Sequence, residues 1–243
     1  MTDWNRRAQR YANLQWTTDN AWARELTRPE FVAGKILDAG CGPGHAGLAF
    51  PDQELLGLDL SPAMARRCPF PVTIGSVTSM PFLADESFDG ALARMLFHHL
   101  LDDDLPRALK ELARVVKPGG KLLVAEGVPP PGCLEWYAEM FALKEERRSF
   151  YATDLLKLIT TEEWGPPFYL NQWVMPGCSL RNWLENATEN GPEILRMHLD
   201  MPENLKQAYH MRVVGDPGNW DSNLRPGDVR LDFHFAVLVV TRQ

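Results

Sequence analysis

The sequence predicts a doubly wound α/β fold, a sheet of mostly parallel strands with helices on both faces. Short apolar runs alternate with helical patterns from residue 35 to about 126, which implies parallel crossovers. The apolar content of 45% is ordinary for a soluble globular protein. With 243 residues the chain is long enough for one large domain with a substantial core.

Seven runs are candidate strands, and they predict a seven-stranded sheet. In chain order they are KILDA, ELLGL, PVTI, FDGALA, KLLVAE, PFYLNQWVM and VRLDFHFAVLVV. The last run is alternating where it begins and continuously apolar towards its end. It is expected to close the sheet.

Helical patterns stand between the strands. DDLPRALKELARVV carries apolar residues at helical spacing, and the turn PGG at 118–120 is expected to end that helix and to begin the next strand. SPAMARRC is a shorter candidate helix, and the first crossover helix is short, with only HAGLAF before Pro51.

The C-terminal half differs from this alternation. GCLEWYAEMFALKEERR and TDLLKLITTEEW are candidate helices, and a long polar stretch from residue 176 to 228 precedes the last strand. That stretch is too long for a plain loop, and within it SLRNWLENA is typical of a helix with Ser179 as its N-cap. We interpret it as an insertion that lies over the ligand face as a lid.

The predicted organisation is a single domain of residues 1–243. It comprises an N-terminal helical cap (1–34), a core (35–175), the lid insertion (176–228) and the final strand (229–243).

Charge and composition exclude several classes of partner. A net charge of −7 argues against nucleic acid, and no stretch is long and apolar enough to span a membrane. The amphipathic first residues have no signal-peptide core, so a cytoplasmic location is expected. Four scattered cysteines and the absence of CxxC or HxxxH give little support for a metal. The run at 144–148 (KEERR) is interpreted as a solvated helix face.

The stretch ILDAGCGPG at 36–44 is the main functional signal. Its glycines, Gly40, Gly42 and Gly44, let the backbone approach a ligand where a Cβ would clash, but their spacing is not the G-x-G-x-x-G of dinucleotide sites. Asp38 would suit a cationic or ammonium group better than a phosphate. Asp59, at the end of the second strand, can accept both hydroxyls of a ribose. The site therefore favours a nucleoside that carries positive charge.

Four motifs, in this order and spacing, resemble the class I S-adenosylmethionine-dependent methyltransferases. They are ILDAGCGPG, GLDLSPAM, FDGALARMLFHHL and ALKELARVVKPGGKLLVAEG. The chain looks most similar to the small-molecule branch that includes the ubiquinone/menaquinone C-methyltransferases. The resemblance covers about residues 35–127 and implies a Rossmann-like fold with S-adenosylmethionine as cofactor.

The resemblance also implies roles for individual residues. The turn from Gly40 to Gly44, including Cys41, would lie against the methionine part and the ribose, and Asp38 would help to hold the ammonium group. Leu60 would lie against adenine beyond Asp59. Arg94 and Met95 would border the methionine end, and Tyr11 on an N-terminal helix would close over the cofactor, with Arg7 and Arg10 as further candidates.

One position departs from the family pattern. The third strand of these enzymes usually ends in Gly-Asp, whose carboxylate accepts from the adenine amino group. This sequence has Ser76 there, followed by Val77. A hydroxyl can accept the same hydrogen bond without charge assistance, so a weaker adenine contact and a simple loop serine are alternatives.

Three residues are candidates for removing a proton from the acceptor. His98 and His99 follow the fourth strand, and histidine titrates near neutrality. Adjacent side chains are expected to diverge, which favours one histidine as the base, and we predict His98. Glu126, at the end of the fifth strand, is the other candidate. The alternatives are that the histidines cap or pack the next helix and that Glu126 is a surface carboxylate.

The elaborated half is expected to build the acceptor pocket. Aromatic residues concentrate there, at Trp136, Tyr137, Phe141, Trp173, Trp183 and Trp220, together with Met140. They are consistent with an aromatic or hydrophobic small molecule, methylated at O, N or C. Two alternatives stay open, a peptide or protein N-methyltransferase and a catalytically silent cofactor-binding module that serves a partner. The sequence leaves the oligomeric state open.

Overall fold

The computed structural model describes residues 4–11, 14, 34–101, 103–187, 190–215 and 228–243. Within them the predicted α/β fold is confirmed. The sheet has the order β3-β2-β1-β4-β5-β8-β6, and a further strand, β7, pairs with β8. The strands are β1 (Lys35–Ala39), β2 (Glu54–Asp59), β3 (Val72–Ile74), β4 (Phe88–Arg94), β5 (Val116–Val128), β6 (Tyr169–Ser179), β7 (Arg212–Val214) and β8 (Asp228–Thr241).

The first five strands are parallel, whereas β8 runs antiparallel to both of its main neighbours, β5 and β6. The seven predicted strands are all present, and β7 is an eighth that the sequence analysis missed. Its three residues are too few to show an alternating apolar pattern in the sequence. Only its pairing with β8 makes it a strand. The strand β6 runs to Ser179, past the predicted start of the insertion, with an irregularity between Met175 and Cys178.

Helices cover one face of the sheet. The helices α5 (Asp104–Val115) and α7 (Ala152–Ile159) bury their apolar sides against alternate residues of the strands, such as Leu37, Ala91 and Leu122. The opposite face, which includes Ile36 and Leu123, is covered in the described part of the chain by the short 3₁₀ turn η1 (Gly47–Ala49) and Phe50. The first crossover is therefore as short as the sequence indicates.

The turn PGG does not separate helix from strand as expected. The strand β5 begins at Val116, directly after α5, and PGG lies within it. Phe88 of β4 pairs with Val116 and Gly90 pairs with Lys121, so the pairing register shifts across PGG. An irregularity within β5 therefore replaces the predicted turn.

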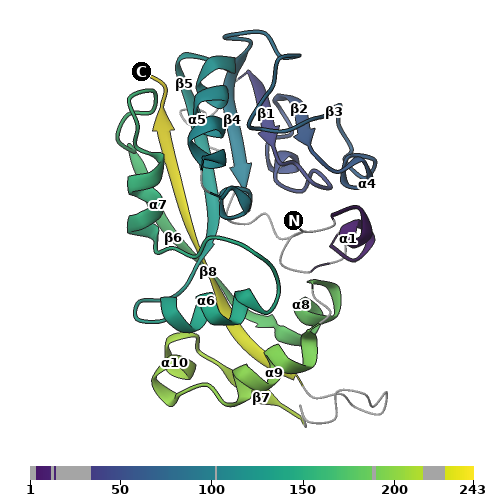
Figure 1. Ribbon diagram of the computed structural model, residues 1–243, viewed down its shortest axis with the longest axis vertical. Coiled ribbons are helices and arrows are strands. Elements are labelled where there is room, and N and C mark those ends of the chain that lie inside the picture. Colours follow the sequence, from purple (N-terminus) through teal and green to yellow (C-terminus); the bar gives the residue numbers. More distant parts are fainter. Residues whose placement is uncertain (1–3, 12–13, 15–33, 102, 188–189, 216–227) are drawn as a thin grey trace.

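A second cluster of helices lies beyond the carboxyl ends of the strands (Figure 1). It contains α6 (Leu134–Ala142), α8 (Leu180–Ala187), α9 (Gly191–Leu199) and α10 (Glu203–Ala208). The strand β8 runs through both parts. Ser179 caps α8 as predicted, because its Oγ accepts the Asn182 N–H at 3.0 Å. The helix α1 (Trp4–Tyr11) contacts α4 (Pro62–Ala65) and α8. The rest of the predicted N-terminal cap, apart from Leu14 and Gly34, lies outside the described residues.

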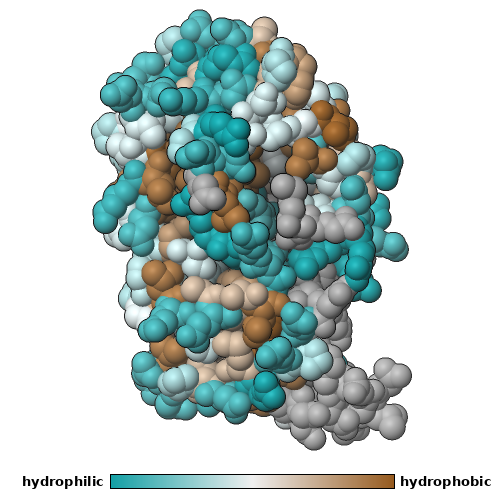
Figure 2. Space-filling model, in the orientation of Figure 1, coloured by the Kyte–Doolittle hydropathy of each residue, from teal (hydrophilic) through white to brown (hydrophobic). Residues whose placement is uncertain are grey.

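Hydrophilic residues cover most of the face shown in Figure 2, and apolar residues show between them near β3 and around α6. Ile74 of β3, Leu60 and Phe82 are among the exposed large apolar residues. No helix among the described residues is long and apolar enough to cross a membrane.

Candidate cofactor and acceptor site

The parallel strands β1, β2 and β4 end side by side, which places the residues after them around one pocket. We call it the glycine-turn pocket. All the residues predicted to bind cofactor, except Gly44, line it: Tyr11, Asp38, Gly40, Cys41, Gly42, Asp59, Leu60, Ser76, Val77, Arg94 and Met95.

Two glycines of the turn have different structural roles. Gly42 has φ of +53°, and a Cβ there would meet nothing within 4 Å, so the backbone borders open space in the pocket. Gly44 has φ of +82°, and a Cβ there would lie 2.6 Å from Cys68 Sγ and 2.8 Å from Pro69 Cδ. Gly44 is therefore required for packing against the segment after α4. It does not line the pocket, which departs from the predicted ligand contact.

Asp59 fixes the shape of the turn. Its Oδ2 accepts the Gly42 N–H at 2.7 Å and its Oδ1 accepts the Ser61 N–H at 2.8 Å. Each carboxylate oxygen has a second lone pair that can accept a hydroxyl. Burial raises the pKa of Asp59, while these two hydrogen bonds oppose the shift. The position fits the predicted ribose contact.

Asp38 is a buried acid with few donors. Its side chain is buried, and Oδ2 accepts a hydrogen bond from the Gly47 N–H at 3.1 Å. Burial raises the pKa of Asp38 to about 7. A cationic group in the pocket would favour the ionised carboxylate and lower that pKa.

Ser76 uses its hydroxyl locally. Its Oγ lies 2.8 Å from Thr78 Oγ1 and accepts the Thr78 N–H at 3.2 Å. Beside it, Leu60 is 58% exposed, an apolar surface within the pocket lining. This end of the pocket therefore offers an apolar contact and one partly engaged hydroxyl.

A second pocket adjoins the first one. We call it the aromatic pocket, because α6, α8 and β8 line it with aromatic side chains, including Trp136, Tyr137, Phe141, Trp183, Phe233 and Phe235. Met140 lines it as well. Trp173 does not line it, and Trp220 lies outside the described residues.

Trp4, Tyr11, Met95 and His99 line both pockets, so the pockets share a wall. Met95 has φ of +53°, and its Sδ accepts the Gly127 N–H at 3.2 Å, which holds this strained residue between them. Burial raises the pKa of Tyr11 to about 12. Of the two candidate arginines, Arg7 lines the aromatic pocket and Arg10 is exposed and lines neither.

His98 and Glu126 form a buried pair. His98 Nδ1 lies 2.6 Å from Glu126 Oε2, and Glu126 Oε1 also accepts the N–H groups of Leu96 and Phe97, at 2.8 and 2.6 Å. With Glu126 ionised, Nδ1 donates to the carboxylate and Nε2 keeps its lone pair. His98 lines the aromatic pocket, but Glu126 lines neither pocket. Glu126 is therefore a residue that positions His98, and the alternative of a surface carboxylate is wrong.

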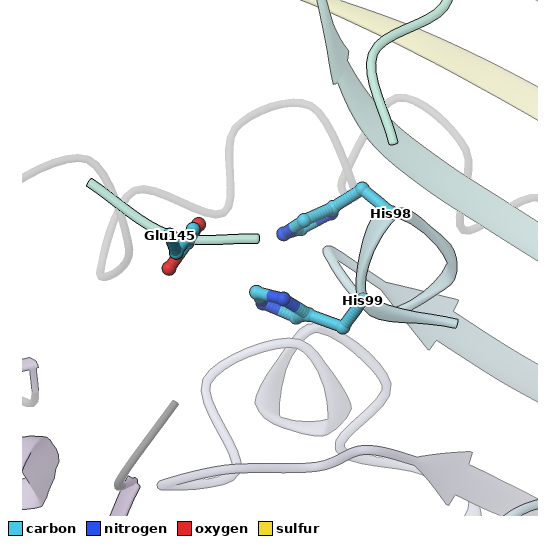
Figure 3. A group of neighbouring side chains, drawn as sticks. All are labelled: His98, His99 and Glu145. Atoms are coloured by element: carbon cyan, nitrogen blue, oxygen red, sulfur yellow. The ribbon is translucent and has the colours of Figure 1, made fainter. Parts of the chain in front are cut away.

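The expectation that the two histidine side chains diverge is wrong. Their ring centroids lie 3.9 Å apart, and Figure 3 shows both rings directed from the turn η2 (Phe97–His99) toward Glu145. Side-chain torsions bring the rings together although the Cα–Cβ bonds start in different directions. Burial lowers the pKa of both histidines well below its usual range, so both are neutral at pH 7.

Glu145 belongs to a buried charge cluster that the sequence analysis misjudged as a solvated face. The helix α6 ends at Ala142, and the side chains of Lys144, Glu145 and Arg147 are 10%, 1% and 2% exposed. The ligand atoms of His98, His99 and Glu145 lie within 4.8 Å of one another, a spacing compatible with a metal ion. Three cations already surround Glu145, which disfavours a divalent cation there.

Comparison with known proteins gives matches to methyltransferases. Residues 37–124 match the family described as a methyltransferase domain. The ubiquinone/menaquinone biosynthesis C-methyltransferase UbiE of Syntrophotalea carbinolica is 34% identical over 132 residues, 48% of this chain and 54% of that protein. The uncharacterized methyltransferase YcgJ of Bacillus subtilis is 26% identical over 167 residues, 59% of this chain and 65% of that protein. The chain thus spans less than two thirds of either relative.

Solved structures agree in fold. The crystal structure of YcgJ superposes with a TM-score of 0.68 at 18% identity, covering 91% of this chain and 99% of that one. Geranyl diphosphate C-methyltransferase of Streptomyces coelicolor gives a TM-score of 0.57 at 15% identity, covering 92% and 80%. The resemblance predicted from the four motifs is confirmed by the sequence matches: residues 37–124 match the methyltransferase domain, and the similar proteins include a ubiquinone/menaquinone C-methyltransferase.

Proposed function

We propose that this protein transfers a methyl group from S-adenosylmethionine to O, N or C of a small organic molecule. One observation carries the proposal. The glycine turn and two strand-end carboxylates, Asp38 and Asp59, line one pocket, and that pocket shares a wall with a second, aromatic one. A donor and an acceptor could therefore be bound on either side of Met95 and His99.

The chain's residues fit this cofactor. The open space beside Gly42 admits a ligand close to the backbone, and the carboxylate of Asp59 can accept ribose hydroxyls. The raised pKa of Asp38 indicates a buried acid that a cation would stabilise in its ionised form. When bound, S-adenosylmethionine supplies a methyl group on a sulfonium. The protein's own part is to align the acceptor, exclude water and take a proton where the acceptor carries one.

The aromatic pocket supports the acceptor side. Its apolar walls favour a flat or hydrophobic molecule and keep water away from the shared wall. His98, held by Glu126 through Nδ1, is the residue proposed to accept a proton at Nε2. The same arrangement of a base oriented by a carboxylate is familiar from other proton-transfer sites.

Cofactor choice is the direct test of the proposal. S-adenosylhomocysteine at about 100 times its Kd should stabilise the folded chain by about 2.7 kcal/mol, a rise of roughly 5 to 10 °C in Tm. NAD at the same concentration should leave Tm unchanged. A shift with NAD and none with S-adenosylhomocysteine would contradict the cofactor assignment.

Turnover is tested separately. Incubation of cell extract with the enzyme and isotopically labelled methyl donor should yield a labelled small molecule. Tight cofactor binding without any labelled product would favour the silent-module alternative.

Asp59→Ala should weaken S-adenosylhomocysteine binding by about 1.5–3 kcal/mol, the range for hydrogen bonds to a charged group. This is roughly a ten- to 150-fold rise in Kd. The substitution also frees the Gly42 N–H from its acceptor, so the turn loses its shape. Calorimetry measures the effect, and Asp52→Ala, in the exposed loop before β2, is the matched control. Unchanged affinity in Asp59→Ala would mean that another residue holds the ribose.

A further inference from the structure

The charged residues of the aromatic pocket are mostly cations. Arg7, Lys144 and Arg147 line it together with one acid, Asp232. Burial lowers the pKa of the four lining histidines, His98, His99, His198 and His234, so they add no charge at neutral pH. A pocket with apolar walls and three cations can select its ligand by negative charge as well as by apolar shape.

The nearby carboxylates are already engaged. Glu145 is shared by all three cations, with Lys144 Nζ at 2.8 Å, Arg7 Nη1 at 3.3 Å and Arg147 Nη1 at 3.9 Å. Asp232 accepts the Gly177 N–H at 2.8 Å and pairs with His210 at 2.7 Å. Glu126, behind His98, accepts three hydrogen bonds of its own.

Arg147 is the cation with a buried donor nitrogen that has no partner in the described part of the chain. Its side chain is 2% exposed, and its guanidinium lies 4.1 Å from the ring centroid of Phe141. Nε donates to the Arg148 carbonyl at 3.1 Å, and the side chain also interacts with the Tyr137 hydroxyl, while Nη2 is buried and has no acceptor within hydrogen-bond distance among the described residues. A buried donor without a partner destabilises the fold, and more so when the group is charged.

Two further polar atoms in the lining of this pocket have the same property. The Tyr209 hydroxyl and His234 Nε2 are buried without a partner in the described part of the chain. Burial also raises the pKa of Tyr209, so its hydroxyl stays protonated and can donate. Buried polar groups in proteins are usually hydrogen-bonded, so several unsatisfied groups in one pocket point to a polar ligand.

We propose that the acceptor is an aromatic carboxylic acid, bound as its carboxylate by Arg147 with its ring against the aromatic walls. The proposal rests on the proposed function and specifies its substrate class. A carboxylate oxygen on Nη2 would satisfy the orphan donor by a charge-assisted hydrogen bond. A single unsatisfied guanidinium nitrogen, with the other cations tied to Glu145, favours a monoanion over a phosphate or diphosphate.

Calorimetry with matched acids and amides tests the proposal. The protein, saturated with S-adenosylhomocysteine, is titrated with benzoate, 2-naphthoate and indole-3-acetate and with the neutral amide of each. At least one acid should bind about ten-fold or more tightly than its amide, the value of a charge-assisted hydrogen bond. Amides that bind as tightly as the acids, or no binding by any acid, would overturn the proposal.

Variants locate the preference. Arg147→Gln should reduce the difference between acid and amide to about three-fold or less, while Arg196→Gln, an exposed arginine on α9, should retain it in full. A preference that survives in Arg147→Gln would contradict the role of Arg147. Affinity for S-adenosylhomocysteine should stay unchanged in both variants and serves as the check on folding. If Arg147→Gln does not fold, the comparison of acid with amide in the unchanged protein still decides the substrate class.

The two proposals fail in distinguishable ways. No stabilisation by S-adenosylhomocysteine would remove the proposed function itself. Stabilisation by S-adenosylhomocysteine, together with equal binding of acids and amides, would remove only the carboxylate proposal and leave methyl transfer in place.

Discussion

His98→Ala is expected to lower kcat by about 10²–10⁴, the usual contribution of a positioned general base. His99→Ala should cost little. Both rings point the same way, so direction does not distinguish them. What distinguishes them is Glu126, whose Oε2 lies 2.6 Å from His98 Nδ1 and which leaves Nε2 of that ring as the acceptor. Single-turnover rates at saturating S-adenosylmethionine measure the difference.

The pH dependence separates the pair from an isolated histidine. Burial raises the pKa of Glu126 to about 7 and lowers the pKa of His98. The two groups share a hydrogen bond, so they take up a proton as one unit when the pH falls through about 7. A base must be unprotonated, so the rate is expected to fall below that pH. In Glu126→Gln the histidine titrates alone with its lowered pKa, so the acid limb should move to lower pH while the plateau rate also drops.

The control is cofactor affinity. His98 does not line the glycine-turn pocket, so His98→Ala should bind S-adenosylhomocysteine as tightly as the unchanged protein does. If both histidine variants keep most of their activity, catalysis is alignment alone, and the acceptor arrives without the proton or loses it to solvent.

The fold was predictable because buried parallel strands leave a direct mark in the sequence. The strands β1 and β5 are covered on both faces, so their residues form continuous apolar runs that a solvated strand would not tolerate. The same geometry explains why Asp38 and Asp59 were found. Parallel strands end at one edge, so residues at their ends converge on one site.

The errors have a common physical origin, since they depend on contacts between residues far apart in the sequence. A run such as KEERR has the composition of a solvated face, but Glu145 pairs with Arg7 of α1 and Lys144 lies over the ring of Trp183 on α8, so distant elements bury the run. The pairing of His98 with Glu126 depends on β4 and β5 being neighbours in the sheet. Gly42 and Gly44 cannot be told apart from the sequence alone. Only the position of Cys68, far along the chain, shows that Gly44 is needed for packing.

Replacing the lid with a short turn is expected to abolish turnover while leaving cofactor affinity within a few-fold. Met175 on β6 pairs directly with Phe233 on β8, so the lid (176–228) and the first residues of β8, up to residue 232, can be replaced by the two-residue turn Asn-Gly to give a tight hairpin. The replacement removes Trp183, His198, Tyr209, Leu231 and Asp232 from the aromatic pocket. No described residue of that segment lines the glycine-turn pocket.

A few-fold change in cofactor affinity is expected in the lid replacement for a structural reason. The helix α1 contacts α8, and its Trp4 and Tyr11 line both pockets, so loss of α8 removes one support of the shared wall. The replacement also uncovers Tyr137, Met140 and Phe141 of α6, so a lower Tm is expected, and circular dichroism must show a cooperative transition. Trp183→Ala keeps the insertion and removes only the ring that packs on Phe141, so it should lower turnover without changing Kd for S-adenosylhomocysteine.

Cofactor affinity in a folded variant is therefore the decisive measurement. The glycine turn is held by Asp59 and by the backbone around β1 and β2, which are independent of the insertion. If a variant that melts cooperatively no longer binds S-adenosylhomocysteine, the insertion must be needed to hold α1 in place against the cofactor pocket. If it binds S-adenosylhomocysteine and still turns over acceptor, the aromatic pocket is not where the acceptor lies. Retained binding with lost turnover is the result that the division into two adjoining pockets requires.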